Sequence, residues 1–166
     1  MQQLRIIKTV LVSAVALFAL LVAFNNITDY GSNFAFVQHV LTMDTTFEGN
    51  QLMHRAIHTP AIHHISYAII IFCEALAGVL CAYGAWKLWK ARKAEQREFN
   101  KSKALANYGL TLGIVLWFTG FMTVGAEWFL MWQSSTWNGQ AAAFKFIVIL
   151  FLVLFFLNQK EHEEAY

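Results

Sequence analysis

Four long apolar runs constrain this chain more than any other feature of its sequence. Each has about 20 residues or more, and at about 1.5 Å of helix per residue that length crosses the roughly 30 Å hydrocarbon layer of a bilayer. The runs cover residues 4–24, 62–88, 106–131 and 138–157. The sequence therefore predicts an all-α polytopic membrane protein, with four transmembrane helices in a single membrane domain 1–166.

The composition agrees with this class. Hydrophobic residues make up 58% of the chain, whereas soluble domains are about half apolar. The net charge is only +2, which gives nucleic-acid binding little support. Cys73 and Cys81 both fall in the second run, where about 12 Å of helix separates them and excludes a disulfide.

The start of the first run has some features of a signal peptide, because Arg5 and Lys8 make it basic. Its apolar stretch is long, however, and no pair of small residues of the kind that signal peptidase recognises closes it. We therefore expect this run to be retained as a transmembrane helix.

The outer segment 25–61 is predicted to hold a short interfacial helix. Turn-forming residues occur at Asn25-Asn26, at Gly31-Ser32-Asn33 and again at Gly49-Asn50. Thr59 followed by Pro60 has the form of an N-cap with proline at the first helical position, so a new helix is expected to begin at Pro60. Apolar residues recur at helical spacing and predict one face lying along the membrane: Phe36, Val40, Met43 and Phe47.

The distribution of basic residues predicts the orientation. Arg5, Lys8, Lys160 and the seven lysines and arginines between Lys87 and Lys103 would lie on one side, opposite Arg55 alone. Positive charge favours the cytoplasmic side, so both termini, the loop 89–105 and the tail 158–166 are predicted to be cytoplasmic. Three tryptophans would then form an aromatic belt at the outer boundary: Trp128, Trp132 and Trp137.

Besides the basic residues near the cytoplasmic ends of the first two runs, three charged residues interrupt the apolar runs: Glu74, Glu127 and Lys145. An unpaired charge at the bilayer centre costs about 2.5 to 3.5 kcal/mol on insertion scales, so each needs a partner or a water-filled cavity. Counted from the outer boundary, the three lie at similar depths, and we expect Lys145 to pair with Glu127 and to reach towards Glu74. The favoured interpretation is a cluster that fastens the helices together; the alternative is a proton or ion path.

The outer segment also gathers four histidines that could serve as metal ligands: His54, His58, His63 and His64. His54 and His58 are four residues apart, and on a helix they would share a face that can chelate zinc or copper. Pro60 separates them from the other two. We expect interfacial or hydrogen-bonding histidines, with a metal or haem site as the alternative.

No P-loop, GxSxG, HExxH or CxxC motif occurs in the sequence. Several distinctive stretches follow one another along nearly the whole chain: 26–30, 36–44, Glu74, 127–134 and 137–140. In this order they resemble a bacterial family of predicted small integral membrane proteins catalogued as a domain of unknown function. The resemblance implies a bacterial inner-membrane protein of four spans and carries no catalytic residues across.

These observations predict a non-enzymatic inner-membrane protein that acts by association, as a homo-oligomer or as an accessory subunit of a larger membrane complex. Its expected partners are membrane lipids and other membrane-protein subunits or copies of itself. No cofactor is predicted, and lipid is the expected bound molecule. Two alternatives stay open: a small proton or ion channel or transporter using Glu74, Glu127 and Lys145, and a metal- or haem-binding redox subunit using the outer histidines.

Overall fold

The computed structural model describes residues 2–160. Within them, four helical segments are long and apolar enough to cross a membrane, and the predicted all-α fold with four spans is confirmed. Residues 161–166 of the predicted tail lie outside the described part of the chain. The spans are Gln2–Thr28, Pro60–Ala91, Gln96–Trp128 and Gln140–Asn158.

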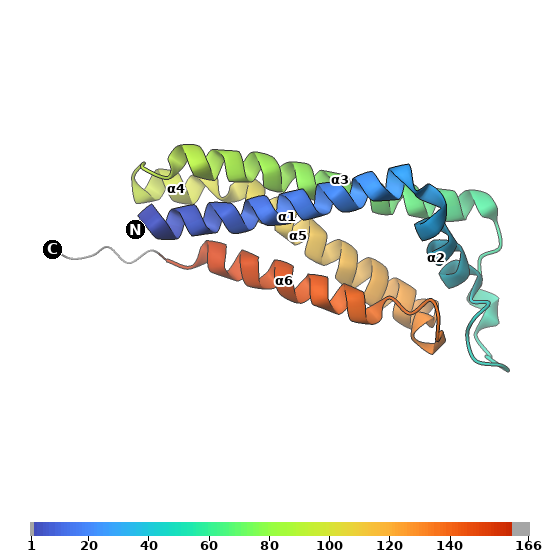
Figure 1. The fold of residues 1–166 in the computed structure, drawn as a ribbon. Coiled ribbons are helices and arrows are strands. Elements are labelled where there is room, and N and C mark those ends of the chain that lie inside the picture. The colour runs from blue at the N-terminus through green and yellow to red at the C-terminus, as the bar shows by residue number, and fades with distance from the viewer. Residues whose placement is uncertain (1, 161–166) are drawn as a thin grey trace.

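The third span is assembled from three helices, whereas each of the other spans is one continuous α-helix (Figure 1). Short helices in the connections complete the described structure. In chain order the elements are α1 (Gln2–Thr28), α2 (Tyr30–Thr42), η1 (Met53–Arg55), α3 (Pro60–Ala91), α4 (Gln96–Ser102), α5 (Ala104–Val115), η2 (Leu116–Trp128), η3 (Met131–Gln133) and α6 (Gln140–Asn158).

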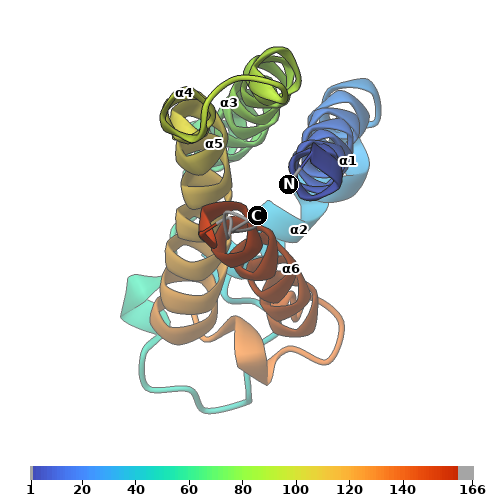
Figure 2. The ribbon, with the colours of Figure 1, turned by 90° about the vertical axis from the view of Figure 1, so that its left-hand side faces the viewer.

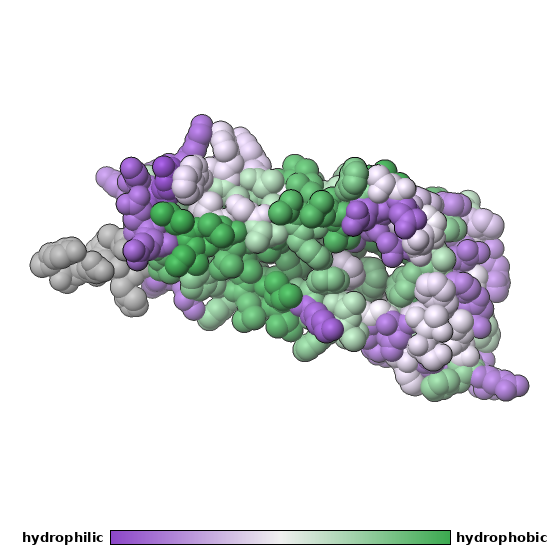
Figure 3. Space-filling model, viewed as in Figure 1, coloured by the Kyte–Doolittle hydropathy of each residue, from purple (hydrophilic) through white to green (hydrophobic). Residues whose placement is uncertain are grey.

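Two ends can be distinguished along the bundle. We call the end with Arg5, Lys8 and the α3–α4 connection the basic end, and the end with α2 and the segment 43–59 the cap end. Figure 3 shows a predominantly hydrophobic band between more hydrophilic surfaces at these two ends. Viewed from the basic end, α1, α3, α5 and α6 follow one another around the bundle (Figure 2).

Helix α3 begins at Pro60, as predicted, although the Thr59 side chain makes no capping hydrogen bond. Two of the three predicted turns are wrong, whereas Gly49 lies in a turn as predicted, closed by the Asn50 N–H donating to the Phe47 carbonyl oxygen. Helix α1 continues through Asn25-Asn26 to Thr28, and Gly31-Ser32-Asn33 lies inside α2. The side chains of Asn26 and Asn33 bond to other side chains, so they do not compete with the helical backbone as asparagine often does. The expected loop 89–105 also contains a short helix, α4.

The basic half of the bundle has a tightly packed apolar core. Helices α3 and α5 approach closely at Gly84, where a Cβ atom would lie 2.5 Å from the backbone nitrogen of Ala106. Gly109 of α5 faces Cys81 and Ala77 of α3 in the same way, as expected for small residues at helix contacts in membranes. Fully buried side chains fill the space between the spans: Val12, Cys81, Leu88, Phe99, Ala106 and Leu110.

In the cap half the spans separate. The third span changes from α-helix to π-helix at Leu116, and this wider helix packs on α6 (Figure 1). The opening between η2 and α3 is covered by α2, whose Val37, Val40 and Leu41 form a second apolar core with Tyr67 and Met131. An apolar cavity of about 340 Å³ remains between α2, α3 and η2.

Candidate functional site

The most unusual buried group is the carboxylate of Glu74. Glu74 lies 14 residues after Pro60, or about 21 Å along α3, and is therefore near the middle of the span. Its side chain is only 5% exposed. The amide nitrogen Nδ2 of Asn26, on α1, donates a 2.7 Å hydrogen bond to its Oε2 atom. This bond joins α1 to α3, and a hydrogen bond of this kind is stronger when its acceptor is ionised.

Asn26 is itself held by two further residues. Its Oδ1 atom accepts a 2.7 Å hydrogen bond from Nδ2 of Asn33 on α2, and its backbone carbonyl accepts a 3.2 Å bond from the hydroxyl of Tyr67 on α3. Asn26 is 6% exposed, whereas Asn33 is an exposed residue. We call Asn33, Asn26 and Glu74 the amide row, because the three side chains connect the surface of the cap end to the centre of the bundle.

Next to Glu74, at the inner end of the amide row, a small cavity of about 30 Å³ lies where all four spans meet. Apart from the Glu74 carboxyl, its lining is almost wholly apolar. The lining includes Val15, Ala77, Gly109, Gly113, Trp117 and Leu150. Further towards the basic end, Cys81, Leu88 and Leu110 are fully buried. The amide row therefore ends at Glu74.

The structure does not bring together the three charges expected to form a cluster. Glu127 and Lys145 are both exposed, and neither makes an ion pair or a hydrogen bond within residues 2–160. The buried carboxylate of Glu74 bonds to Asn26 instead of Lys145. The expected pairing assumed a regular α-helix, but Glu127 lies on the π-helix, where residues follow a different period and point in different directions.

His54 and His58 do not share a helix face, so the chelating pair of the alternative metal-site hypothesis is not formed. His54 lies in the short helix η1, and the chain becomes extended at Ala56, before His58. Both side chains are exposed. Among residues 2–160, no group of three or more histidine, cysteine, aspartate or glutamate side chains is close enough to hold a metal ion.

The other two histidines have separate surroundings. His63 is buried, with its Nε2 atom 2.8 Å from the carbonyl oxygen of Ile57. His64 stacks on the ring of Phe34, at a centroid distance of 4.2 Å, and its Nδ1 atom is hydrogen-bonded to the hydroxyl of Tyr30 at 2.8 Å. These contacts fix the start of α3 against α2 and the connection that precedes α3.

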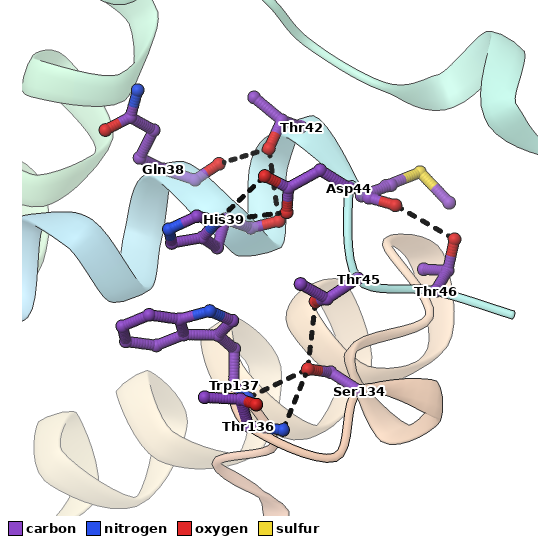
Figure 4. A network of polar contacts seen from close by, with 10 residues as sticks. Gln38, His39, Thr42, Asp44, Thr45, Thr46, Ser134, Thr136 and Trp137 are labelled. Atoms are coloured by element: carbon purple, nitrogen blue, oxygen red, sulfur yellow. Dashed lines mark hydrogen bonds and ion pairs between the residues drawn. The ribbon is translucent and has the colours of Figure 1, made fainter.

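A polar network joins the cap to the connection between the third and fourth spans (Figure 4). The Ser134 hydroxyl accepts hydrogen bonds from the Thr45 hydroxyl at 2.9 Å and from the backbone N–H groups of Thr136 and Trp137 at 3.3 and 2.8 Å. Beside it, Nδ1 of His39 lies 2.8 Å from a carboxylate oxygen of Asp44. The network ties two loops that are far apart in the sequence.

The three tryptophans of the expected aromatic belt all lie near this connection, and each has a partner within the protein. The guanidinium of Arg55 lies 4.5 Å from the centre of a Trp128 ring. Trp132 contacts Phe47 edge to face at 5.7 Å, and Trp137 stacks on His39 at 4.6 Å. Besides any role at a membrane boundary, these tryptophans hold the cap in place.

Asn26, Asn33 and Tyr67 are the site residues that sequence reasoning missed. The two asparagines were interpreted as turn formers because asparagine favours turns in water. The available signal was Glu74 itself: a carboxylate within an apolar span needs a hydrogen-bonding partner, and amides of neighbouring helices can supply one.

Four apolar spans, a buried polar row and a folded cap define a polytopic helical membrane protein. The family model for predicted small integral membrane proteins of unknown function, DUF2165, matches residues 4–160. The chain belongs to this family, in agreement with the resemblance noted in its sequence. No match is found among curated proteins or solved structures.

Proposed function

We propose that this protein acts by association within the bacterial inner membrane, without catalysing a reaction. It would do so as a homo-oligomer or as an accessory subunit of a larger membrane complex. The observation that carries the proposal is Lys145, a charged residue that is exposed on the apolar helix α6 and has no partner within residues 2–160.

An exposed ammonium group inside a span is costly unless it reaches water or meets an opposite charge. Lys145 lies five residues after Gln140, or about 8 Å into α6 from the cap end. Its exposed neighbours include Phe144 and Ile149, both apolar. A carboxylate on another protein molecule could form an ion pair with the Lys145 ammonium group. That ion pair would also fix which side of α6 contacts the other molecule.

Glu127 supplies a matching charge near the same end of the bundle. It is the last residue but one of η2, is exposed, and also lacks a partner among the described residues. Two copies placed side by side can pair Lys145 of one with Glu127 of the other. This arrangement would use the two charges within the spans that have no partner among residues 2–160, and it is the reason we favour a homo-oligomer.

The proposed orientation places both termini in the cytoplasm. It is supported by the lysines and arginines of the basic end, opposite Arg55 at the cap end. The cap, with its tryptophans and hydrogen-bonded loops, would then face the outer side.

Charge reversal tests this pairing directly. Two differently tagged copies are placed in lipid nanodiscs or vesicles, and their association is measured by energy transfer between fluorescent labels. We expect Lys145→Glu or Glu127→Lys alone to weaken self-association by about tenfold, as for loss of a pair worth about 1.4 kcal/mol. Mixing the two variants should restore association, because each copy then carries the charge that the other requires.

Lys93→Glu serves as the control, since it changes the same charge type at the basic end and should leave association unchanged. Self-association that is equal in all variants would overturn the homo-oligomer. If the wild type is monomeric but retains another membrane protein in a gentle purification, and Lys145→Glu loses that protein, the accessory-subunit form of the proposal holds. A wild-type protein that associates neither with a second copy of itself nor with another membrane protein would contradict the proposal altogether.

A further inference from the structure

The amide row gives Glu74 a connection to only one end of the bundle. Towards the cap end, the carboxylate bonds to Asn26 and Asn26 bonds to Asn33, which is exposed. Towards the basic end, about 16 Å of α3 between Ala77 and Leu88 packs on the apolar core of the other spans. A small hydrophilic species could therefore approach the carboxylate from the cap end alone.

The space beside Glu74 suits water and protons better than a metal cation. The cavity of about 30 Å³ exceeds the roughly 10–15 Å³ that one water molecule needs. Hard metal cations, in contrast, take about six or more oxygen ligands. Here the carboxylate is the only oxygen-bearing side chain in the lining, and its Oε2 atom already accepts the N–H of Asn26.

Few other charges face this carboxyl group. Tyr67 and Cys73 lie near it on α3, and Asp29 and Tyr30, at the junction of α1 and α2, lie near Tyr67. Helices α5, η2 and α6 contribute only Gly109, Gly113, Leu116, Trp117 and Leu150 to the cavity lining. No fixed cation of the lining holds the carboxylate in its ionised form, so its charge can respond to its surroundings.

We propose that Glu74 is a proton-binding site inside the membrane that exchanges protons with the cap side and not with the basic side. This inference is independent of the proposed association through Lys145. Proton uptake converts the Glu74 carboxylate into a neutral carboxylic acid and removes the ionised acceptor of the Asn26 N–H. Because that charge-assisted bond joins α1 to α3, the contact between the two helices would weaken when protons are abundant on the cap side.

A membrane-permeant carbodiimide tests the proposal, since it modifies protonated carboxyl groups and the product is found by mass spectrometry. The wild-type protein is placed in vesicles, and its orientation is determined from protease access to a tag after residue 166. The pH is then changed on one side at a time. Raising the pH on the cap side should lower the rate of Glu74 labelling by up to about tenfold per pH unit. The same change on the basic side should not alter the labelling rate.

Glu74→Gln identifies the labelled position, and the exposed Glu98→Gln variant at the basic end serves as its control. Because the sided experiment uses the wild-type chain, it does not depend on either variant folding. Equal responses to the two sides would overturn one-sided access. Absence of Glu74 labelling at every cap-side pH would overturn the proton site itself.

Discussion

Asn26 donates a 2.7 Å hydrogen bond to the Glu74 carboxylate and thereby joins the cap-end turn of α1 to the middle of α3. The donor is 6% exposed and the acceptor 5%. Neither group can exchange its partner for bulk water without separating the helices. This bond and the bond from the Tyr67 hydroxyl to the Asn26 carbonyl join α1 to α3, in addition to the apolar contacts between the two helices.

Replacing Asn26 with leucine should destabilise the protein, because a buried carboxylate then loses its donor. The expected loss in the free energy of unfolding is about 1–3 kcal/mol, the usual cost of an unsatisfied buried polar group. Unfolding by a denaturing detergent, followed by circular dichroism, measures it. Asn25→Leu is the matched control, since Asn25 is exposed and has no side-chain contact with Glu74; an equal loss in both variants would contradict the role given to Asn26.

Gly84→Ala should push α3 and α5 apart. The new methyl group would lie 2.5 Å from the Ala106 nitrogen and 2.8 Å from its Cα atom, and these are backbone atoms that cannot rotate away. Overpacking of this kind costs about 1–3 kcal/mol, measurable as a lower unfolding midpoint. Gly31→Ala, on α2, has nothing within 4 Å of the added atom, and should be neutral or stabilising by up to about 1 kcal/mol because alanine is the better helix former.

Ser134→Ala should loosen the cap without unfolding the bundle. The buried hydroxyl accepts bonds from Thr45 and from the backbone of Thr136 and Trp137. Its loss leaves these donors unsatisfied at a cost of about 1–3 kcal/mol. Hydrogen exchange should become faster in 43–47 and 134–138 while α1 and α3 keep their protection. The neighbouring Ser135 is exposed, so Ser135→Ala should leave exchange unchanged; faster exchange in both variants would argue against the network.

Arg55→Ala should weaken the attachment of the cap to the third span. The guanidinium lies over a Trp128 ring, and its Nη1 atom donates a 3.3 Å bond to the Trp128 carbonyl. A cation–π contact at an exposed site is worth about 0.5–1 kcal/mol. The unfolding free energy should fall by about that amount, and Arg55→Lys should recover part of it because the ammonium keeps the charge. An unchanged stability in Arg55→Ala would show that the contact contributes nothing.

The sequence alone determined the number of spans and the start of α3. Both depend on local chemistry: about 20 apolar residues must be buried in hydrocarbon, and proline is accommodated at the first position of a helix. The apolar periodicity of Phe36, Val40, Met43 and Phe47 likewise predicted a helix before α3. Helix α2 lies there and holds Phe36 and Val40, but it ends at Thr42, so Met43 and Phe47 lie beyond it. The same reasoning identified Glu74 as a buried carboxylate that needs a partner.

Only the tertiary structure decided which residue that partner is. Pairing across helices depends on how each helix is rotated and where it crosses its neighbour, and spacing along one chain does not specify either quantity. The third span is a π-helix from Leu116 to Trp128, where the residue period differs from that of an α-helix; Glu127 on this helix and Lys145 on α6 are both exposed. Asn26 became the partner of Glu74 because α1 continues as a helix beyond its apolar run, and this extra turn carries the amide to the carboxylate.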